Sequence, residues 1–195
     1  VNARNALRPI PGASANGRLA TNAITRVAMA EESAYKRKKN IDGHSPAIAG
    51  NVLDAYSACR ITTDHECATP EELRERVRRG MYVMLRQGTA CKNVTTLVKG
   101  VDEGNSSRVL FCTDDRQPQS IEREGHINYG VNLAIKEGLS PLMAISMATL
   151  NAATCYGLSD RGAIAPGLRA DFFLTEKLDD LQPEEVFILG KAVAR

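Results

Sequence analysis

Histidine and carboxylate side chains stand at the ends of three short apolar runs in this chain. They are His44 after the first run, His65 and Glu66 after the second, and Asp114 and Asp115 after the third. Imidazole nitrogens and carboxylate oxygens are common ligands of divalent metal ions. Such an ion lowers the pKa of bound water towards ~7 and supplies hydroxide at neutral pH. These residues therefore favour a hydrolytic metal site with His44, His65 and Asp114 as ligands.

The elements that must position these side chains have the composition of buried strands, each followed by a helix. The apolar runs cover residues 39–44, 59–64, 81–86 and 108–113. Successive strand ends are 21, 21 and 28 residues apart when they are placed at His44, His65, Arg86 and Asp114. This spacing is typical of consecutive β/α units, and strands that are apolar on both faces are typical of a covered parallel sheet. We expect four adjacent parallel strands, in chain order, that bring these side chains to one edge.

The segments around the strands predict helices and, near the C-terminus, a small β element. Thr69-Pro-Glu-Glu72 combines an N-cap threonine, a proline and a capping-box glutamate, so a helix should begin there and end at Gly80. Further helices are expected over about residues 19–39, 45–56, 90–102, 120–138 and 140–157. Strands are expected over residues 170–175 and 186–189, after a turn-rich connector.

The overall composition is that of an ordinary soluble protein. Of 195 residues, 43% are hydrophobic and 25% are charged, with a net charge of +2. Residues 1–40 hold eight Lys or Arg and two Glu, so the rest of the chain carries 17 minus 21, or −4. There is no basic stripe with interleaved aromatic residues, which argues against a nucleic-acid partner. No apolar run approaches ~18 residues, so we expect no membrane span.

The cysteines and the first residues bear on the compartment and on the extent of the chain. Five cysteines without a Cys-x-x-Cys pair argue against a disulfide framework and a structural zinc knuckle. We therefore expect reduced thiols in a cytoplasmic protein, with Cys112 in the core. The first thirty residues carry four Arg and no acidic residue, which faintly resembles a transit peptide. Because the chain begins at Val1, we expect instead that it is a piece of a longer polypeptide.

Six motifs in this order resemble the adenine deaminase family of the amidohydrolase superfamily, over about residues 39–195. They are Asp-Gly-His44, Thr-Asp-His65-Glu, Cys-Thr-Asp114-Asp, Glu124-Gly-His126-Ile, Met147-Ala-Thr-Leu-Asn-Ala152 and Gly162-Ala-Ile-Ala-Pro-Gly-Leu-Arg-Ala-Asp171. Each motif is weak alone, whereas their shared order is specific. The resemblance implies a metal-dependent hydrolase.

The family resemblance also implies a fold, an α/β (β/α)8 (TIM) barrel with a β-sandwich assembled from both chain ends. Residues 39–158 would then form the C-terminal half of the barrel, with strands 5–8, and residues 159–195 the C-terminal strands of the sandwich. Residues 1–38 are an N-terminal segment that matches the family poorly. A complete barrel takes ~250 residues. We therefore expect a partner, either the missing half of the barrel or a second copy in a homo-oligomer.

The resemblance assigns the metal ligands residue by residue. His44 and His65 match the histidines that end barrel strands 5 and 6, and Asp114 matches the strand 8 aspartate, a ligand and base. The expected cofactor is a divalent metal, Mn or Fe first and Zn as the alternative. The family also uses a His-x-His pair on strand 1, which is absent here, and an acidic residue on strand 4, for which Glu31 or Glu32 is a candidate.

The implied reaction is hydrolytic deamination of adenine to hypoxanthine and ammonia, as in purine salvage. Hydroxide adds to C6 of adenine, and Asp114 takes up a proton and returns it to the departing amine. Glu66 would shuttle a proton or remain solvated. Asp115 and His126 would contact adenine, although Asp115 could replace Asp114 as the ligand and His126 could lie on a helix surface.

Two other functions fit the same residues. Another cyclic amidohydrolase, such as a dihydroorotase or an amino-sugar deacetylase, would share the histidines and Asp114. The absence of a His-x-His pair favours an inactive remnant that acts as an interaction module. On either enzymatic interpretation, we expect the chain alone to be a poor catalyst.

Overall fold

The computed structural model describes residues 32–34, 36–37 and 39–194. The described residues up to 41 belong to one unit and those from 42 onwards to a second. In the first unit, residues 32–34 are helical and Glu32 forms an ion pair with Lys36 at 2.8 Å, both exposed. Glu31, most of the helix predicted over 19–39 and most of the poorly matched segment 1–38 lie outside the described residues.

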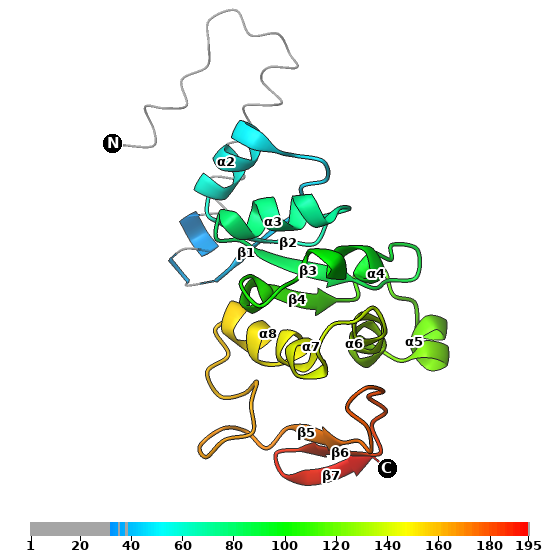
Figure 1. The fold of residues 1–195 in the computed structure, drawn as a ribbon. Helices are drawn as coiled ribbons and strands as arrows, with labels where there is room; N and C mark the ends of the chain where they lie inside the picture. Colours follow the sequence, from blue (N-terminus) through cyan, green and yellow to red (C-terminus); the bar gives the residue numbers. More distant parts are fainter. Residues whose placement is uncertain (1–31, 35, 38, 195) are drawn as a thin grey trace, which may run out of the picture. The chain divides into compact units, whose positions relative to one another are not determined.

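A four-stranded sheet forms the centre of the second unit (Figure 1). Its strands follow chain order and are β1 (Ile41–Gly43), β2 (Ile61–Asp64), β3 (Tyr82–Arg86) and β4 (Val109–Cys112). β2 pairs with β3 in parallel, with Asp64 opposite Val83, and β3 pairs with β4 in parallel, with Arg86 opposite Cys112. The predicted strand order is therefore confirmed, and so is the parallel pairing of β2, β3 and β4.

Helices follow each strand, as the β/α spacing predicts. They are α2 (Gly50–Ala58), α3 (Pro70–Arg78), α4 (Val94–Leu97) with the short 3-10 helices η2 (Val98–Gly100) and η3 (Ser106–Arg108), α5 (Pro118–Glu124), α6 (Ile127–Lys136), α7 (Pro141–Ala148) and α8 (Leu150–Cys155). Two predictions of single helices were wrong. The segment 120–138 breaks at Gly125, whose φ of 100° only glycine adopts readily. The segment 140–157 breaks at Thr149, whose ψ is −82°.

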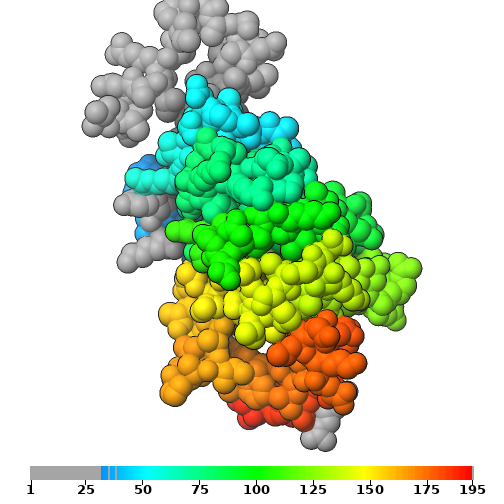
Figure 2. Space-filling model, viewed as in Figure 1, coloured from blue at the N-terminus to red at the C-terminus, as the bar shows by residue number. Residues whose placement is uncertain are grey.

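Both faces of β3 and β4 are buried, because alternate residues point to opposite sides of a strand. On one face, Val83, Leu85, Val109 and Phe111 pack in the main core with residues of α3, α4, α6 and α7. On the other face, Met84 and Leu110 pack against Cys155 of α8. Figure 2 shows the yellow part of the chain, around residue 150, directly against the green part, around residue 100. This double cover makes the strand ends a rigid support for the side chains that follow them.

The C-terminal residues form a separate antiparallel sheet of β5 (Phe172–Leu174), β6 (Glu185–Ile188) and β7 (Lys191–Ala194). β5 and β6 correspond to the two strands predicted there, and the rings of Phe172 and Phe187 stack at 4.6 Å. Asn132 of α6 fixes the segment before β6, because its Oδ1 accepts the backbone N–H of Leu181 at 2.8 Å. Among the described residues, no helix has the length and apolar character that crossing a bilayer requires.

The start of α3 is capped as its sequence predicts. The Thr69 hydroxyl accepts the N–H of Glu72 at 3.2 Å, and the Glu72 carboxylate accepts the N–H of Ala68 at 2.6 Å. Because α3 carries the buried residues Leu73 and Arg76, this cap also positions core side chains.

Replacing the cap in Thr69→Ala should lower the free energy of unfolding by about 1 kcal/mol, because one helix N–H loses its partner. Urea denaturation measures this change. The matched control is Thr96→Ala, which alters an exposed threonine inside α4 and should leave the midpoint nearly unchanged. Equal losses in the two variants would contradict the cap.

The five cysteines should form two groups that react with iodoacetamide at different rates at pH 8. Burial raises the pKa of the Cys67 and Cys112 thiols to about 12, and Cys155 is also buried, whereas Cys59 and Cys91 are exposed. Since the thiolate is the reactive form, Cys59 and Cys91 should be labelled first. Peptide mass spectrometry gives the order in which the cysteines are labelled. In the chain unfolded by urea, all five cysteines should be labelled at similar rates. Labelling of Cys67 as fast as Cys91 would show that this core is open.

Candidate metal centre

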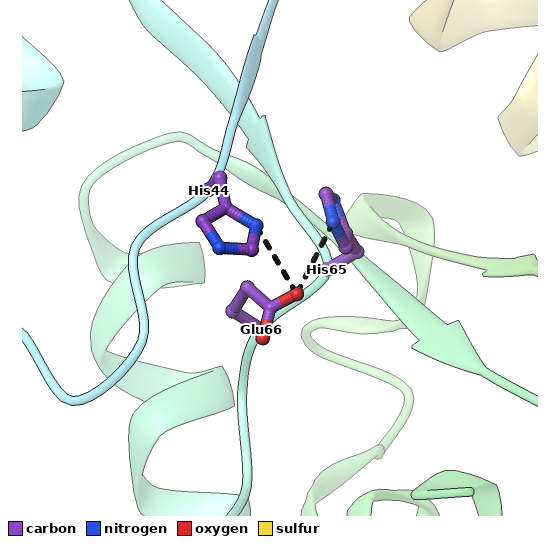
Figure 3. Close-up of side chains that lie close together, drawn as sticks. All are labelled: His44, His65 and Glu66. Atoms are coloured by element: carbon purple, nitrogen blue, oxygen red, sulfur yellow. Dashed lines mark ion pairs between the residues drawn. The ribbon is translucent and has the colours of Figure 1, made fainter. Parts of the chain in front are cut away.

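Two imidazoles and one carboxylate meet at the ends of β1 and β2 (Figure 3). Glu66 Oε1 lies 3.3 Å from His44 Nδ1 and 3.3 Å from His65 Nε2. The imidazole rings have centroids 5.6 Å apart and are tilted by 53°. One ligand atom from each residue lies within 4.8 Å of the others, and this is the only such group in the part of the chain that the structure describes.

Gly43 allows this close approach of the first strand end to the second. A Cβ atom at this position would collide with the backbone oxygen of Thr63 and the hydroxyl of Tyr56. That hydroxyl accepts the N–H of His44 at 2.9 Å, so α2 holds the backbone of the first histidine. The His44 side chain itself is 72% exposed, which leaves its ring accessible to a ligand.

His65 lies between two carboxylates. Its Nε2 faces Glu66, while its Nδ1 is 3.8 Å from Asp42 Oδ2. Asp42 is fixed in turn, because its Oδ1 accepts the Thr63 hydroxyl at 2.6 Å. Histidine ligands of metals commonly turn the second ring nitrogen towards a carboxylate, which fixes the orientation of the ring. The placement of His65 follows this pattern, with Nε2 as the nitrogen directed at Glu66.

Arg86, at the end of β3, connects this group to Asp114. Its Nη1 donates to Glu66 Oε1 at 2.6 Å and to Asp114 Oδ2 at 3.0 Å, and its Nη2 donates to Glu66 Oε2 at 3.3 Å. Its side chain is only 11% exposed. Sequence reasoning gave Arg86 no role in the site, although the same 21-residue spacing that identified His44 and His65 also places Arg86 at this edge.

The predicted ligand Asp114 lies outside the group of three. It is an exposed residue with a φ of 48°, and its carboxylate contacts the group through Arg86. The predicted ligands His44 and His65 are thus brought together, and Glu66, predicted as a proton shuttle, lies between them. The structure does not bring Asp114 into direct contact with either histidine.

The two predicted substrate contacts lie on the loops beyond this group. Asp115 Oδ2 accepts the N–H of Ala90 at 2.8 Å, and this backbone hydrogen bond lowers the pKa of the Asp115 carboxyl. His126 is exposed at the start of α6, where its N–H donates to Asn128 Oδ1 at 2.9 Å. Asp115 therefore holds the loop after β3, and a role for either residue in binding substrate stays a prediction.

The donor set fits a divalent metal ion. Neutral imidazoles and a carboxylate are the ligands that Zn, Mn and Fe take in hydrolytic sites. His44 Nδ1, His65 Nε2 and Glu66 Oε1 offer that combination with both nitrogens turned towards one oxygen. Cys112 of β4 is not part of this group, and burial raises the pKa of its thiol to about 12.

Comparison with known proteins gives relatives at high identity. The chain is 55% identical over 161 residues to adenine deaminase 2 of Desulfotalea psychrophila, an alignment that covers 83% of this chain and 28% of that protein. It is 50% identical over 162 residues to an adenine deaminase of Nitratidesulfovibrio vulgaris, with 83% and 28% covered. The chain therefore spans less than a third of the length of these curated relatives.

Solved structures and a family profile complete the comparison. An amidohydrolase from Thermotoga maritima aligns with a TM-score of 0.62 and 17% identity over 91% of this chain and 56% of that chain. At this identity the likeness concerns the fold alone, which is α/β with a parallel sheet. The profile of the amidohydrolase family matches residues 19–193. Together with the curated relatives, this match shows that the chain belongs to the amidohydrolase family.

Proposed function

We propose that the chain is part of a metal-dependent hydrolase that converts adenine and water to hypoxanthine and ammonia, and that it supplies some of the metal ligands. The observation that carries the proposal is the meeting of His44, His65 and Glu66 at the ends of neighbouring strands. Relatives named adenine deaminase, at 45–55% identity, support adenine as the substrate. Five free thiols support the cytoplasm as the compartment.

The active protein, on this proposal, contains more than these residues. The sheet has four strands in the order β1-β2-β3-β4, half the number in a (β/α)8 barrel. We assign them as strands 5–8, and β5–β7 as part of the composite sandwich. The remaining barrel strands come from the longer polypeptide that the 28% coverage of the relatives implies, or from a partner chain. Those strands would also supply the remaining metal ligands.

His44, His65 and Glu66 are the residues that would hold the metal from this half, with Asp114 as the proposed further ligand. The favoured ion is Mn or Fe, with Zn as the alternative. When bound, such an ion supplies hydroxide at neutral pH.

Proton transfer falls to the carboxylates at the same edge. Asp114 accepts a proton at a carboxylate oxygen and delivers it to the departing amine, and Glu66 is the second proton carrier. Arg86 holds both carboxylates through one nitrogen, at 2.6 Å from Glu66 and 3.0 Å from Asp114. This contact keeps the two acids close enough to act on one small substrate. Asp115 and His126 border the proposed adenine pocket on the loops after β4.

Substitutions in the full-length enzyme that contains this chain test the assignment of ligands and base. His44→Ala and His65→Ala should each lower the bound metal measured by elemental analysis. Asp114→Asn should keep most of the metal and lose at least ~100-fold in adenine turnover, because an amide offers an oxygen but cannot accept a proton. Asp115→Asn is compared with Asp114→Asn, because the two carboxylates are adjacent in the chain. If Asp115→Asn is inactive and Asp114→Asn is active, the base is the second carboxylate.

The isolated 195-residue chain, supplied with Mn²⁺ or Fe²⁺, should deaminate adenine far more slowly than the full-length enzyme, because it holds only part of the ligand set. Release of ammonia measures both rates. A panel with dihydroorotate and an N-acetylated amino sugar identifies the substrate of the full-length enzyme. Preference for either compound over adenine would replace the proposed reaction, and a full-length protein without metal would support the interaction module.

A further inference from the structure

A buried ion pair lies directly beneath the candidate metal centre. Arg76 of α3 donates through Nε to Asp64 Oδ2, and both side chains are completely buried. Charges buried to this degree need partners for every hydrogen-bonding atom, because an unpaired buried charge is costly. Asp64 is the last residue of β2 and immediately precedes His65. The proposed function does not use either residue.

The partners of this ion pair are the residues next to the candidate ligands. Asp64 Oδ2 also accepts the Ser45 hydroxyl at 2.8 Å, and Asp64 Oδ1 accepts the N–H of Glu66 at 3.3 Å. Arg76 Nη2 donates to the Ser45 backbone oxygen at 2.6 Å. Ser45, itself 3% exposed, directly follows His44. One carboxylate and one guanidinium therefore connect the chain after β1 to the chain after β2.

The geometry of the network matters more than its contribution to stability. A buried ion pair adds little net stability, since the cost of removing two charges from water offsets their attraction. Its hydrogen bonds are directional, however, and the planar guanidinium reaches Asp64 and Ser45 in fixed relative positions. The His44 side chain is 72% exposed and has no core packing of its own. The position of the His44 imidazole therefore depends on the hydrogen bonds that fix the backbone around His44.

We propose that Arg76, Asp64 and Ser45 form a positioning network that sets the spacing between His44 and Glu66. The effect of this network on metal binding rests on the proposed function, because that function makes His44 and Glu66 metal ligands. Arg76 acts through Ser45 and Asp64 and touches neither metal nor substrate. The network fixes the backbone after β1 at Ser45 and the backbone after β2 at Glu66. Arg86 contacts the carboxylates of Glu66 and Asp114 and is not part of this network.

The first test compares Arg76→Lys with Arg79→Lys in the 195-residue chain. Lysine keeps the charge opposite Asp64, but one ammonium group cannot also reproduce the forked contact with Ser45. Arg79 lies three residues further along the chain and pairs only with Asp54 and Glu75 near the surface. Co²⁺ is titrated at a temperature where each chain is fully folded, so that global stability does not enter the affinity.

Arg76→Lys should bind Co²⁺ at least ~10-fold more weakly than the unaltered chain, with a changed visible spectrum that reports altered ligand geometry. Arg79→Lys should match the unaltered chain in both respects. Equal affinity and spectrum for Arg76→Lys and Arg79→Lys would overturn the network. If Arg76→Lys does not fold, the paired replacement of Asp64→Leu with Arg76→Met removes both charges together and takes its place.

Hydrogen exchange without metal tests the network separately from the proposed function. The amide of Glu66, which donates to Asp64 Oδ1, should exchange faster in Arg76→Lys, while those of Val83 and Leu85 in β3 keep their rates. Unchanged exchange at Glu66 would refute the network even if metal binds. If the unaltered chain binds no Co²⁺ but the exchange pattern is found, the network is retained and its role in metal binding by this chain is refuted.

Discussion

The parallel pairing of β2, β3 and β4 is the constraint on which the rest of the structure depends. Parallel strands end at the same edge of a sheet, so residues that are far apart in the sequence lie close together there. The register places Arg86 opposite Cys112, so β3 and β4 end level, whereas β2 ends at Asp64, opposite Val83 near the start of β3. The same pairing sends alternate residues into two cores, and these cores keep the edge rigid.

Much of this fold could be predicted because the signals are local. Short apolar runs identified the strands, and the capping box of Thr69 and Glu72 located the start of α3. The breaks at Gly125 and Thr149 could not be predicted, because apolar residues continue with helical spacing across both positions. A glycine inside such a pattern is equally compatible with a continuous helix. Backbone geometry at these positions depends on how α6 and α8 pack.

The sequence predicts which residues of the site lie at strand ends. It does not predict the direction in which each side chain points. His44 and His65 meet as their positions indicated. Asp114, the second residue after β4, adopts a φ of 48°, a conformation that aspartate tolerates and that no neighbouring residue signals. Arg86 could not be assigned to the site from the sequence, because an arginine side chain is not a metal ligand. Its contacts with Glu66 and Asp114 exist only in three dimensions.

The position of Arg86 means that the chain carries its own counter-ion where its carboxylates gather. A divalent ion entering the site would therefore meet a positive charge that already compensates one of the two carboxylates. Part of the negative charge at this edge is thus balanced within the sheet itself, which lessens the repulsion between the two acids in the folded chain.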